Sequence, residues 1–408
     1  MKKQVLKIDS IFECEIMYLE NEGSGVTRIN NFVVFVPKAL VGELVKIKIT
    51  EIKKNYAVAK LLEIIKPSKY RIKPNCEYYN ICGGCNLRHQ VQNKNIDFKQ
   101  DKVSNAMNKI GKININLESI IESPQYDNYR NKAVFKVEKD KIGFYEQNSY
   151  FLVDISYCKL LNDNINYVYV LKIIKKYLIN NIENKIYEIT IRYALASDEL
   201  LINILSKENE LKLSEYLKDN IKNVKSIFLN NNLIYGNKYI NEDINNLMFK
   251  YSAKSFFQVN TRQAENIYNY ILNLDLNSND TVLDLYSGVG TISSIISRKV
   301  KHVYGIEIEE EAIECANENI KLNSINNITF IHGNADSLNK INDKISVVIL
   351  DPPRGGSNKK TLDNIIKLNP NKIIYISCNP VTLARDINYI YNFNYIINSI
   401  NAFDMFPN

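Results

Sequence analysis

The sequence predicts an α/β protein whose C-terminal part is a Rossmann-like domain, preceded by a small β-barrel and a mixed α+β domain. Three observations lead to this prediction. Residues 6–63 contain short runs in which polar and apolar residues alternate, a cysteine-bearing segment follows, and after residue 250 apolar strands alternate with helices. Since a chain of 408 residues exceeds one ordinary core, we expect domains at 1–65, 66–250 and 251–408.

The composition is that of a globular, basic chain. Hydrophobic residues make up 45% of it, and the formal net charge is +7. This charge fits a polyanionic partner. However, the excess is mostly lysine in a chain that is also rich in Asn and Ile, and a bias in the codons of the gene would produce the same composition. No apolar run approaches the roughly 20 residues that span a bilayer, and the N-terminus lacks the apolar run of a signal peptide. Together with an odd number of cysteines, these features predict a cytoplasmic monomer without a membrane partner.

The N-terminal segment is predicted to be an OB-like barrel, the small fold that often binds oligonucleotides. We expect five short strands, with four of them near 14–18, 32–36, 45–49 and 57–62. Short strands at this density are typical of such barrels. The alternative is a small β-barrel of any other kind, and we favour nucleic-acid binding.

Three cysteines follow at a spacing typical of metal sites. The pattern Cys-x5-Cys-x2-Cys encloses paired glycines that let the backbone wrap around sulfur, and its members are Cys76, Cys82, Gly83, Gly84 and Cys85. A fourth ligand is then needed, and Cys14, Cys158 and His89 are the candidates. From spacing alone zinc is a serious competitor of an iron-sulfur cluster, whereas disulfides are a weak alternative in a cytosolic chain.

The residues that follow are predicted to be mixed α and β. A helix is expected at 97–110, closed by Gly111, and the wider helical stretch 92–118 is expected to dock on the C-terminal domain. Strands are expected at 133–138 and 188–192. This stretch shows no phosphate loop and no catalytic triad.

After residue 250 the pattern changes to alternating strands and helices. The expected strands are 281–285, 302–308, 328–331, 347–350 and 372–376, and the expected helices include 262–274 and 310–322. Strands that are apolar throughout and separated by helices indicate a parallel sheet covered on both faces.

A glycine-rich turn follows the first of these strands. Gly288 and Gly290 come after a buried strand and before a helix, so backbone can approach a ligand there. Glu307 stands about 20 residues further on, at a strand end where carboxylates hold ribose hydroxyls. The third glycine of a dinucleotide fingerprint is missing, which disfavours NAD and favours S-adenosylmethionine, a cofactor without a pyrophosphate.

Two further strand ends complete this predicted cofactor site. Asp336 follows the strand at 328–331 and is expected near the adenine amino group of the cofactor. Asp351 begins the run Asp351-Pro352-Pro353, a rigid turn expected beneath the methyl donor. These features occur in order at the carboxyl ends of successive strands, so they predict an S-adenosylmethionine-dependent methyltransferase domain.

Cys378 follows the last predicted strand, in the run Ile376-Ser377-Cys378-Asn379-Pro380. Cysteine is the side chain most readily used as a nucleophile near neutral pH. A thiol at the mouth of a cofactor fold therefore predicts covalent chemistry on an electrophilic carbon. The alternative is a buried cysteine at a strand end.

Several of these motifs occur together in one known family. They are Cys76-x5-Cys82-Gly83-Gly84-Cys85, Tyr129-Arg130-Asn131-Lys132, Ser255-Phe256-Phe257-Gln258-Val259-Asn260, Asp284-Leu285-Tyr286-Ser287-Gly288-Val289-Gly290, Asp351-Pro352-Pro353-Arg354 and Ser377-Cys378-Asn379-Pro380. With these motifs the sequence resembles the RNA uracil-5-methyltransferase family. It is most similar to the 23S rRNA branch, which has an N-terminal TRAM domain and an iron-sulfur cluster, and the resemblance spans almost the whole chain.

The resemblance implies roles for individual residues. Those implied to line the S-adenosylmethionine site are Gln258, Tyr286, Thr291, Glu307 and Asp351. Arg130 and Phe256 would lie near the target RNA, which is 23S rRNA in this branch. Cys158 would be the fourth ligand of a [4Fe-4S] cluster.

The resemblance also implies a reaction, in which the Cys378 thiolate adds to carbon 6 of uracil and makes carbon 5 nucleophilic. A base then removes the carbon-5 proton, and the target base is expected to be flipped out of its stack. Family members place this base, a glutamate, beyond an Asp-Met-Phe-Pro segment, whereas the sequence given ends at Asn408. Asp404 lies within the shared segment, so we do not expect it to substitute. We expect slow turnover or a stalled covalent adduct.

Three alternatives are kept. A non-catalytic RNA-binding protein or folding chaperone would retain the core as a scaffold, but intact Cys378, Gln258 and Asp351 argue against it. A tRNA uracil-5-methyltransferase is disfavoured by the extra barrel and the cysteine cluster. An amino-methylating adenine enzyme also uses an Asp-Pro-Pro turn, but it usually has an aromatic residue where this chain has Arg354.

Overall fold

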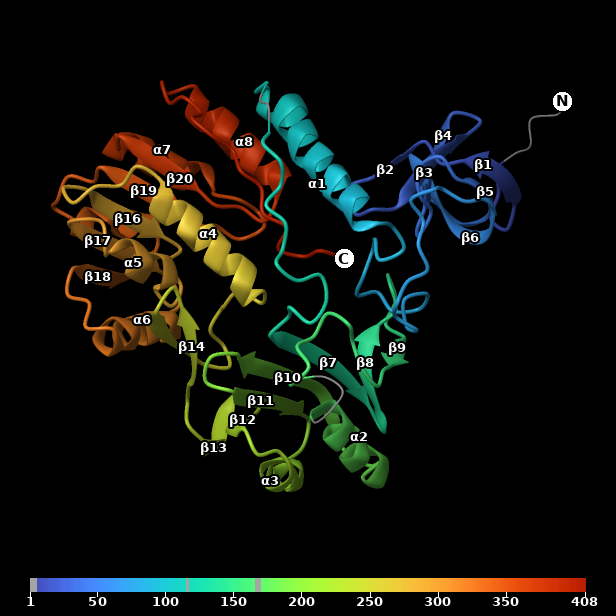
Figure 1. Ribbon diagram of the computed structural model, residues 1–408, viewed down its shortest axis with the longest axis horizontal. Coiled ribbons are helices and arrows are strands. Elements are labelled where there is room, and N and C mark those ends of the chain that lie inside the picture. The colour runs from blue at the N-terminus through green and yellow to red at the C-terminus, as the bar shows by residue number, and fades with distance from the viewer. Residues whose placement is uncertain (1–5, 115–116, 166–169) are drawn as a thin grey trace. The chain divides into compact units, whose positions relative to one another are not determined.

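The structure is a computed structural model that describes residues 6–114, 117–165 and 170–408 (Figure 1). These residues form two compact units. The first comprises residues up to 102 with 145–153 and 407–408, and the second comprises 103–144 and 154–406. Within the described ranges, helices are too short or too polar to cross a membrane.

The first unit is built on a six-stranded sheet in the order β1-β5-β6-β4-β3-β2. Its strands are β1 (Ile11–Glu15), β2 (Tyr18–Leu19), β3 (Gly25–Ile29), β4 (Phe32–Val36), β5 (Leu44–Ile52) and β6 (Tyr56–Lys66). The strand expected at 14–18 is wrong, because the chain changes partners there: the N–H of Ile16 donates to Glu43 O, and that of Met17 donates to Val26 O. The sheet therefore has six strands where the sequence predicted five.

A buried ion pair joins this sheet to the segment that follows it. Glu43 is fully buried and accepts hydrogen bonds from Arg71 Nε at 2.5 Å and Nη2 at 2.8 Å. The N–H groups of Leu40 and Ser68 donate to the same carboxylate at 2.8 and 3.2 Å. Burial would raise the pKa of Glu43, but these hydrogen bonds outweigh it and hold the pKa below its ordinary value.

The second unit contains a mostly antiparallel sheet. In spatial order its strands are β13 (Asn232–Gly236), β12 (Val224–Leu229), β11 (Glu199–Ser206), β10 (Ile186–Ala194), β7 (Lys132–Glu138) and β8 (Lys141–Tyr145). Strand β9 (Leu152–Asp154) and helices α2 (Val170–Asn180) and α3 (Leu211–Asn220) are the other elements of this stretch. The strands expected at 133–138 and 188–192 are present as β7 and β10, each somewhat longer than predicted.

The helix expected at 97–110 begins earlier, at the start of the wider expected stretch 92–118, and it ends in an irregular turn. Helix α1 runs over Gln92–Ala106 and continues into a π-helical turn at Met107–Gly111. Met107 of this turn is fully buried and packs with Ala384 of α8 (Pro380–Tyr391). This end of the segment therefore contacts the C-terminal part of the chain.

A five-stranded parallel sheet forms the core of that C-terminal part. Its order is β18 (Ile328–His332), β17 (His302–Glu307), β16 (Thr281–Leu285), β19 (Val347–Leu350) and β20 (Lys372–Tyr375). Neighbouring strands are all parallel. The chain proceeds outward from β16 to β18 and then returns to the other side at β19, so the topological switch point lies at the carboxyl end of β16.

Helices cover both faces of this sheet (Figure 1). One face packs against α4 (Thr261–Asn273), α5 (Thr291–Ile296) and α6 (Glu310–Leu322), and the other against α7 (Lys359–Leu368) and α8. Val282 belongs to the first layer and Leu283 to the second, and both are fully buried. Successive residues of a strand are apolar because both faces are covered. The predicted Rossmann-like α/β fold is confirmed.

A β-hairpin precedes the parallel sheet. It consists of β14 (Ile240–Ile244) and β15 (Leu247–Tyr251). Two side-chain oxygens at the C-terminal end of α6 hold the hairpin backbone: Asn319 accepts from Lys250 N at 2.7 Å, and Asn323, which caps the helix, accepts from Met248 N at 2.9 Å. The segment that follows Tyr251 therefore begins from a fixed point beside α6.

Candidate active site

The glycine-rich turn bends at the carboxyl edge of the parallel sheet. The N–H of Tyr286 donates to Ile306 O of β17 at 3.0 Å. Tyr286, Gly288 and Gly290 have φ values of 65°, 55° and 79°. At Gly290 an added Cβ would come within 2.5 Å of the Phe330 ring, whereas at Gly288 it would meet nothing within 4 Å. Gly290 is thus required by conformation and by space, and Gly288 borders open space where a ligand can approach.

Glu307 ends β17 with its carboxylate against this turn. One oxygen accepts from the N–H of Gly288 at 2.9 Å. The other accepts from the N–H groups of Ile308 at 2.7 Å and Glu309 at 3.0 Å. Three backbone donors therefore fix the predicted ribose-binding acid. A carboxylate has further acceptor sites, so it can still bind a hydroxyl.

Two more carboxyl groups lie at neighbouring strand ends. Asp284 of β16 is 1% exposed, and one of its oxygens accepts from Ser293 Oγ at 2.5 Å. Burial raises the pKa of Asp284 to about 7, the bond from Ser293 opposes this, and repulsion from Asp351 adds to it. Asp351 follows β19, and burial raises its pKa to about 6. A cation bound near either carboxyl group would favour its ionised form and lower its pKa.

These groups fit the S-adenosylmethionine that the sequence predicts. The cofactor carries positive charge on its sulfonium and amino groups, which carboxylates attract. Asp284 Oδ1 and Ser287 Oγ are buried without a hydrogen-bond partner among the described residues, so they can accept or donate to a ligand. Thr291, the first residue of α5, is buried beside the turn. The side chain of Asp336, predicted near adenine, lies outside the described residues.

The segment between β15 and α4 presents an aromatic side chain to solvent. Phe257 is buried and stacks on Tyr251, with ring centroids 4.4 Å apart and an interplanar angle of 10°. Its neighbour Phe256 is therefore turned outward and is 70% exposed. An exposed aromatic ring beside an anchored one is placed to stack on a flat ligand.

Arg130 and Gln258 meet at this segment, although they are far apart in sequence. Arg130 forms an antiparallel bridge with Asn260. Asn131 donates its N–H to Val259 O at 2.9 Å and its side-chain amide to Gln258 O at 3.1 Å. The structure thus brings the two predicted RNA-site motifs together through the backbone.

Positive charge accumulates beside the same segment. Arg192 of β10 is 3% exposed and donates to Ser255 O at 2.6 Å. Lys132 of β7 stands directly opposite Arg192 in the strand register. Burial, followed by repulsion from Arg192 and Arg130, lowers the pKa of Lys132 to about 8. These cations provide an environment that favours phosphate groups.

Cys378 lies in the loop between β20 and α8, and its thiol is exposed. The alternative of a buried strand-end cysteine is therefore wrong. Asn379 caps α8 and donates its side-chain amide to Arg354 O at 3.2 Å. Thr382 Oγ1 donates to the same carbonyl at 3.3 Å. The Cys378 loop is thus tied to the turn that begins at Asp351.

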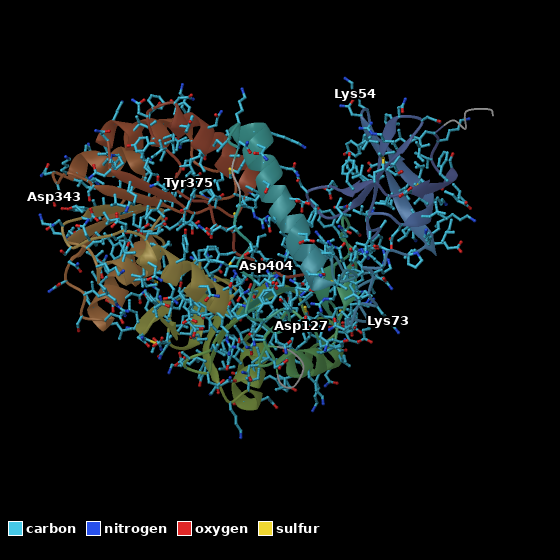
Figure 2. All side chains as sticks on the ribbon, turned by 45° about the horizontal axis from the view of Figure 1, so that its top comes forward. Lys54, Lys73, Asp127, Asp343, Tyr375 and Asp404 are labelled. Carbon is cyan, nitrogen blue, oxygen red and sulfur yellow. The ribbon has the colours of Figure 1, made fainter. Side chains whose placement is uncertain are left out.

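Asp386 of α8 ties the same two loops a second time. This carboxylate is 1% exposed and accepts from Ser357 N at 2.8 Å, Tyr375 Oη at 2.6 Å and Arg385 Nε at 2.7 Å. Tyr375 is the last residue of β20 and is labelled in Figure 2. Arg385 also donates to Gly355 O at 2.9 Å. One buried carboxylate therefore connects the loop after β19, the end of β20 and α8.

The cysteine-rich loop belongs to the first unit and Cys158 to the second. Burial raises the pKa of Cys82 and Cys85, and both thiols interact electrostatically with Cys76. The N–H of Gly84 donates to Cys82 Sγ at 3.4 Å. Nevertheless, in the described part of the chain no three Cys, His, Asp or Glu side chains form a group that could hold a metal ion. The placement of these side chains therefore does not support the cluster that the resemblance implies.

The other two candidate ligands lie in different surroundings. Cys14 is a half-buried residue of β1. His89 is fully buried, with Nδ1 against the hydroxyl of Tyr79. Burial lowers the pKa of His89 to about 3. His89 is therefore a neutral core histidine.

Three residues that organise the site were not among the predicted site residues. Asp284 belongs to an expected strand, Asn131 to a motif that carries no assigned role for it, and Asp386 to a stretch for which no element is predicted from the sequence. A signal existed for Asp386, because a charged Arg-Asp pair interrupts an otherwise amphipathic helix soon after Cys378. Its partners in other loops could not be read from it.

Comparisons with known proteins agree with this geometry. The sequence matches the tRNA (Uracil-5-)-methyltransferase family over residues 91–408 and the TRAM domain over residues 8–62. It is 35% identical to an uncharacterized RNA methyltransferase of Clostridium tetani, over 100% of this chain and 96% of that protein. It is 34% identical to one of Caldanaerobacter subterraneus, over 98% of this chain and 96% of that protein.

A solved structure shows the same fold. It is the Pyrococcus abyssi tRNA (uracil-54, C5)-methyltransferase in complex with S-adenosyl-L-homocysteine, which superimposes with a TM-score of 0.79 at 24% identity and 97% coverage of both chains. The family match covers well over half of the chain, and the relatives align over nearly all of it. The chain belongs to the tRNA (uracil-5-)-methyltransferase family.

Proposed function

We propose that this protein methylates carbon 5 of a uridine in 23S rRNA, with Cys378 as the nucleophile. One observation carries the proposal: the exposed Cys378 loop is tied to the turn at Asp351 by the bonds of Asn379 and Asp386. A thiol and an acid-lined site suited to a cationic methyl donor thus lie on adjoining loops of one sheet edge. Methylation of a weakly nucleophilic carbon needs both.

The Cys378 thiolate adds to carbon 6 of uracil, forms a carbon–sulfur bond, and shifts the ring electrons into an enolate that is nucleophilic at carbon 5. Carbon 5 then bonds to the electrophilic methyl group that S-adenosylmethionine, when bound, would supply, and the cofactor leaves as a neutral thioether. A base then accepts the carbon-5 proton, and the returning electrons expel the Cys378 thiolate and restore the ring. Gln258, Tyr286, Glu307 and Asp351 would hold the cofactor during these steps.

RNA would approach along the segment that carries Phe256. Chemistry on a base requires the base to leave its stack, and flipped bases commonly stack on aromatic side chains. Phe256 is exposed for that purpose, and Arg130 and Lys132 beside it would contact phosphate groups. The TRAM domain would add further contacts to the RNA.

Different observations support ribosomal RNA and transfer RNA as the substrate. The cysteine spacing and the TRAM domain resemble the 23S rRNA branch. The names of the family and of the P. abyssi enzyme refer to tRNA, which makes tRNA the second candidate. The two substrates are distinguished by assaying both.

The test is methylation of 23S rRNA and tRNA transcripts with labelled S-adenosylmethionine, followed by mass spectrometry of the nucleosides. We expect 5-methyluridine in 23S rRNA, its loss in Cys378→Ala, and its retention in Cys14→Ala, a matched control that removes a half-buried thiol of the first unit. If 5-methyluridine forms in tRNA alone, the substrate is tRNA and the proposed 23S rRNA substrate is wrong. Methylated adenosine, or full activity of Cys378→Ala, would refute the mechanism, and failure to bind the cofactor in calorimetry would favour a non-catalytic RNA-binding or chaperone role.

We also propose that Cys76, Cys82 and Cys85 of the first unit bind an iron-sulfur cluster. The Cys-x5-Cys-x2-Cys spacing supports the proposal, as does the bond from the Gly84 N–H to Cys82 Sγ. Anaerobic purification followed by iron and acid-labile sulfide analysis tests the proposal. A colourless protein with stoichiometric zinc and no iron would refute it.

A further inference from the structure

A cavity of about 260 Å³ lies in the second unit, beside the Arg130 motif. Its walls come from four places in the sequence: the segment before β7, the loop at 162–164, the end of β10 and the start of α4. Ligand pockets for drug-sized molecules usually measure about 300–1,000 Å³. This cavity is therefore of a size for a single small planar group.

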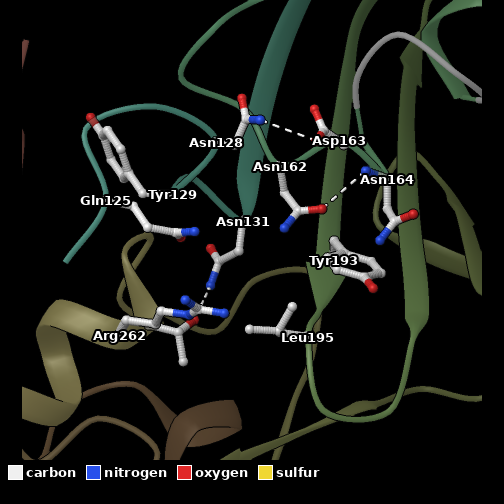
Figure 3. A pocket seen from close by; sticks show the side chains of 11 residues that line it. Gln125, Asn128, Tyr129, Asn131, Asn162, Asp163, Asn164, Tyr193, Leu195 and Arg262 are labelled. Atoms are coloured by element: carbon white, nitrogen blue, oxygen red, sulfur yellow. Dashed lines mark hydrogen bonds between the residues drawn. The ribbon is translucent and has the colours of Figure 1, made fainter.

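The lining of the cavity is rich in amides. Figure 3 shows the side-chain ends of Gln125, Asn131, Asn162 and Arg262 pointing toward one another across the space. Tyr193, which is 4% exposed, forms part of the wall. Amides supply donors and acceptors side by side, as the edges of nucleobases do.

Some side chains of this lining are held by hydrogen bonds, whereas others can bind a ligand. Asn131 donates to Thr261 Oγ1 at 2.8 Å and Tyr193 donates to Asp198 at 3.0 Å, so both are held in place. The side chains of Gln125 and Arg262, in contrast, have no hydrogen-bond or ion-pair partner among the residues that the structure describes. Their amide and guanidinium groups can therefore bind a ligand without breaking an existing bond.

An acidic group lies at the same cavity. Asp163 is exposed and accepts from Asn128 Nδ2 at 3.1 Å, which leaves further acceptor sites on its carboxylate. Carboxylates accept from the exocyclic amino groups of bases, and guanidinium groups bind phosphates. The combination of Asp163 with Arg262 favours a nucleotide whose base carries an amino group over a simple anion.

The cavity adjoins the predicted target site through one residue. Asn131 lines the cavity and also donates to the backbone carbonyl groups of Gln258 and Val259. These residues follow the Phe256-Phe257 pair in the sequence. A strand of RNA that places one base on Phe256 would therefore pass next to the cavity.

We propose that this cavity binds the base of a second nucleotide, which flanks the target uridine and carries an exocyclic amino group. Gln125 reads the edge of that base and Arg262 contacts its phosphate. The inference rests on the proposed function, since it assigns a sequence-reading role within the same RNA complex. It predicts that the enzyme selects its uridine by a neighbouring base as well as by the uridine itself.

The experiment combines protein variants with a scan of the RNA. Gln125→Ala and Arg262→Ala are compared with Arg298→Ala, a control that removes an exposed arginine bonded to the turn at Asn245 in the same unit. A specific contact to a base is worth about 10- to 100-fold in discrimination. We expect KM for RNA to rise about tenfold in both variants, with KM for S-adenosylmethionine unchanged. In the scan, replacing one flanking nucleotide by uridine should impair the wild type but not Gln125→Ala.

Each outcome decides the inference separately from the proposed function. If the wild type makes 5-methyluridine but both variants behave like Arg298→Ala, the cavity binds no nucleotide and the proposed function stands. If Arg262→Ala weakens RNA binding while Gln125→Ala keeps the wild-type response at every scanned position, the cavity contributes charge alone and base reading is refuted. If the wild type methylates neither RNA, the proposed function fails, and the same scan in a filter-binding assay decides the cavity. Thermal unfolding of each variant verifies that it is folded.

Discussion

Replacing Asp386 by asparagine tests how a buried carboxylate positions two loops of the site. In the wild type Oδ2 accepts from Ser357 N at 2.8 Å and from Tyr375 Oη at 2.6 Å, and Oδ1 accepts from Arg385 Nε at 2.7 Å. Asparagine keeps the shape but has one acceptor oxygen and adds two donors. The single amide oxygen can therefore accept from the donors that bind one carboxylate oxygen of Asp386, but not also from the donor that binds the other.

The size of the effect follows from which bonds survive. If the amide oxygen keeps Ser357 and Tyr375, the amide NH₂ faces Arg385, and one charge-assisted bond worth about 1.5–3 kcal/mol is lost. We therefore expect Asp386→Asn to lower the free energy of unfolding by about 2–3 kcal/mol. Asp386→Ala removes all the acceptors and leaves the Ser357 N–H and the Tyr375 hydroxyl without them, so it should cost about 2–6 kcal/mol at about 1–3 kcal/mol for each buried group.

Two measurements separate positioning from stability. Urea unfolding gives the free energy, and steady-state methylation at a temperature where each variant is folded gives kcat and the KM values. Because Asp386 connects the loop of Asp351 with that of Cys378, we expect Asp386→Asn to lower kcat about tenfold or more while KM for RNA changes little. A solely structural role would lower stability and leave kcat of the folded protein unchanged.

A matched control exists in the same domain. Asp363 of α7 accepts a hydrogen bond from the hydroxyl of Tyr389, so Asp363→Asn perturbs a similar tyrosine–carboxylate pair away from the Cys378 loop. If Asp386→Asn loses no more stability than Asp363→Asn and keeps its kcat, the positioning argument is refuted. Gly356→Ala provides an independent perturbation, because its φ is +75° and an added Cβ would come within 2.6 Å of Asp386 Oδ2.

Three further predictions concern the cofactor site and the first unit. The pKa values of Asp284 and Asp351 are raised to about 7 and 6. We therefore expect the affinity for S-adenosylmethionine to rise between about pH 5 and pH 7, by up to about tenfold per pH unit for each carboxyl group that loses a proton. Binding of the cofactor should also release protons. Calorimetry in buffers of different ionisation enthalpy measures this, and a flat profile contradicts it. Arg71→Ala leaves Glu43 buried and unpaired and should cost the first unit about 3–5 kcal/mol by thermal melting. Because the pKa of Glu43 is lowered in the folded state, this carboxylate stabilises the wild type at pH values above 4.5, the ordinary pKa of a glutamate. The stabilisation is lost as pH falls through the folded-state pKa. A difference in melting temperature between wild type and Arg71→Ala that persists at low pH would therefore argue against the ion pair. Gly290→Ala should abolish cofactor binding, because the new methyl group would overlap the aromatic ring that packs there from β18, and unchanged binding in calorimetry would show that the turn is not the cofactor site.

The parallel sheet could be predicted from the sequence because burial on both faces makes each strand apolar throughout. The expected strands at 281–285 and 347–350 and the expected helix at 310–322 coincide with β16, β19 and α6. The expected helical stretch 92–118 begins where α1 does, at Gln92, whereas the narrower helix expected at 97–110 starts too late because the first turn of α1 is polar and shows no apolar periodicity. The π-helical turn at its end packs Met107 against another helix, a contact that local sequence does not encode.

The contacts within the site could not be predicted, because they join polar side chains of distant loops. The order of strand ends placed Glu307 and Asp351 at one edge of the sheet, and this follows from parallel topology. In contrast, the bonds from Asn131 to Gln258 and from Ser357 to Asp386 are made by groups that occur equally in any solvent-exposed loop. The raised pKa of Asp284 depends on how deeply a charged strand residue is buried, and sequence alone leaves that open.

The predicted site follows one rule, in which an exposed side chain of proposed function stands next to a neighbour that packing or hydrogen bonds hold in place. Phe256 is exposed beside Phe257, which is stacked in the core, and exposed Cys378 precedes Asn379, whose side chain is bonded to Arg354 O. The rule has a physical reason. A group that reacts with RNA must reach solvent, where packing cannot fix it, so precision has to come from the residue next to it. Substitutions at these anchored neighbours should therefore change kcat without removing any group proposed to contact the substrate.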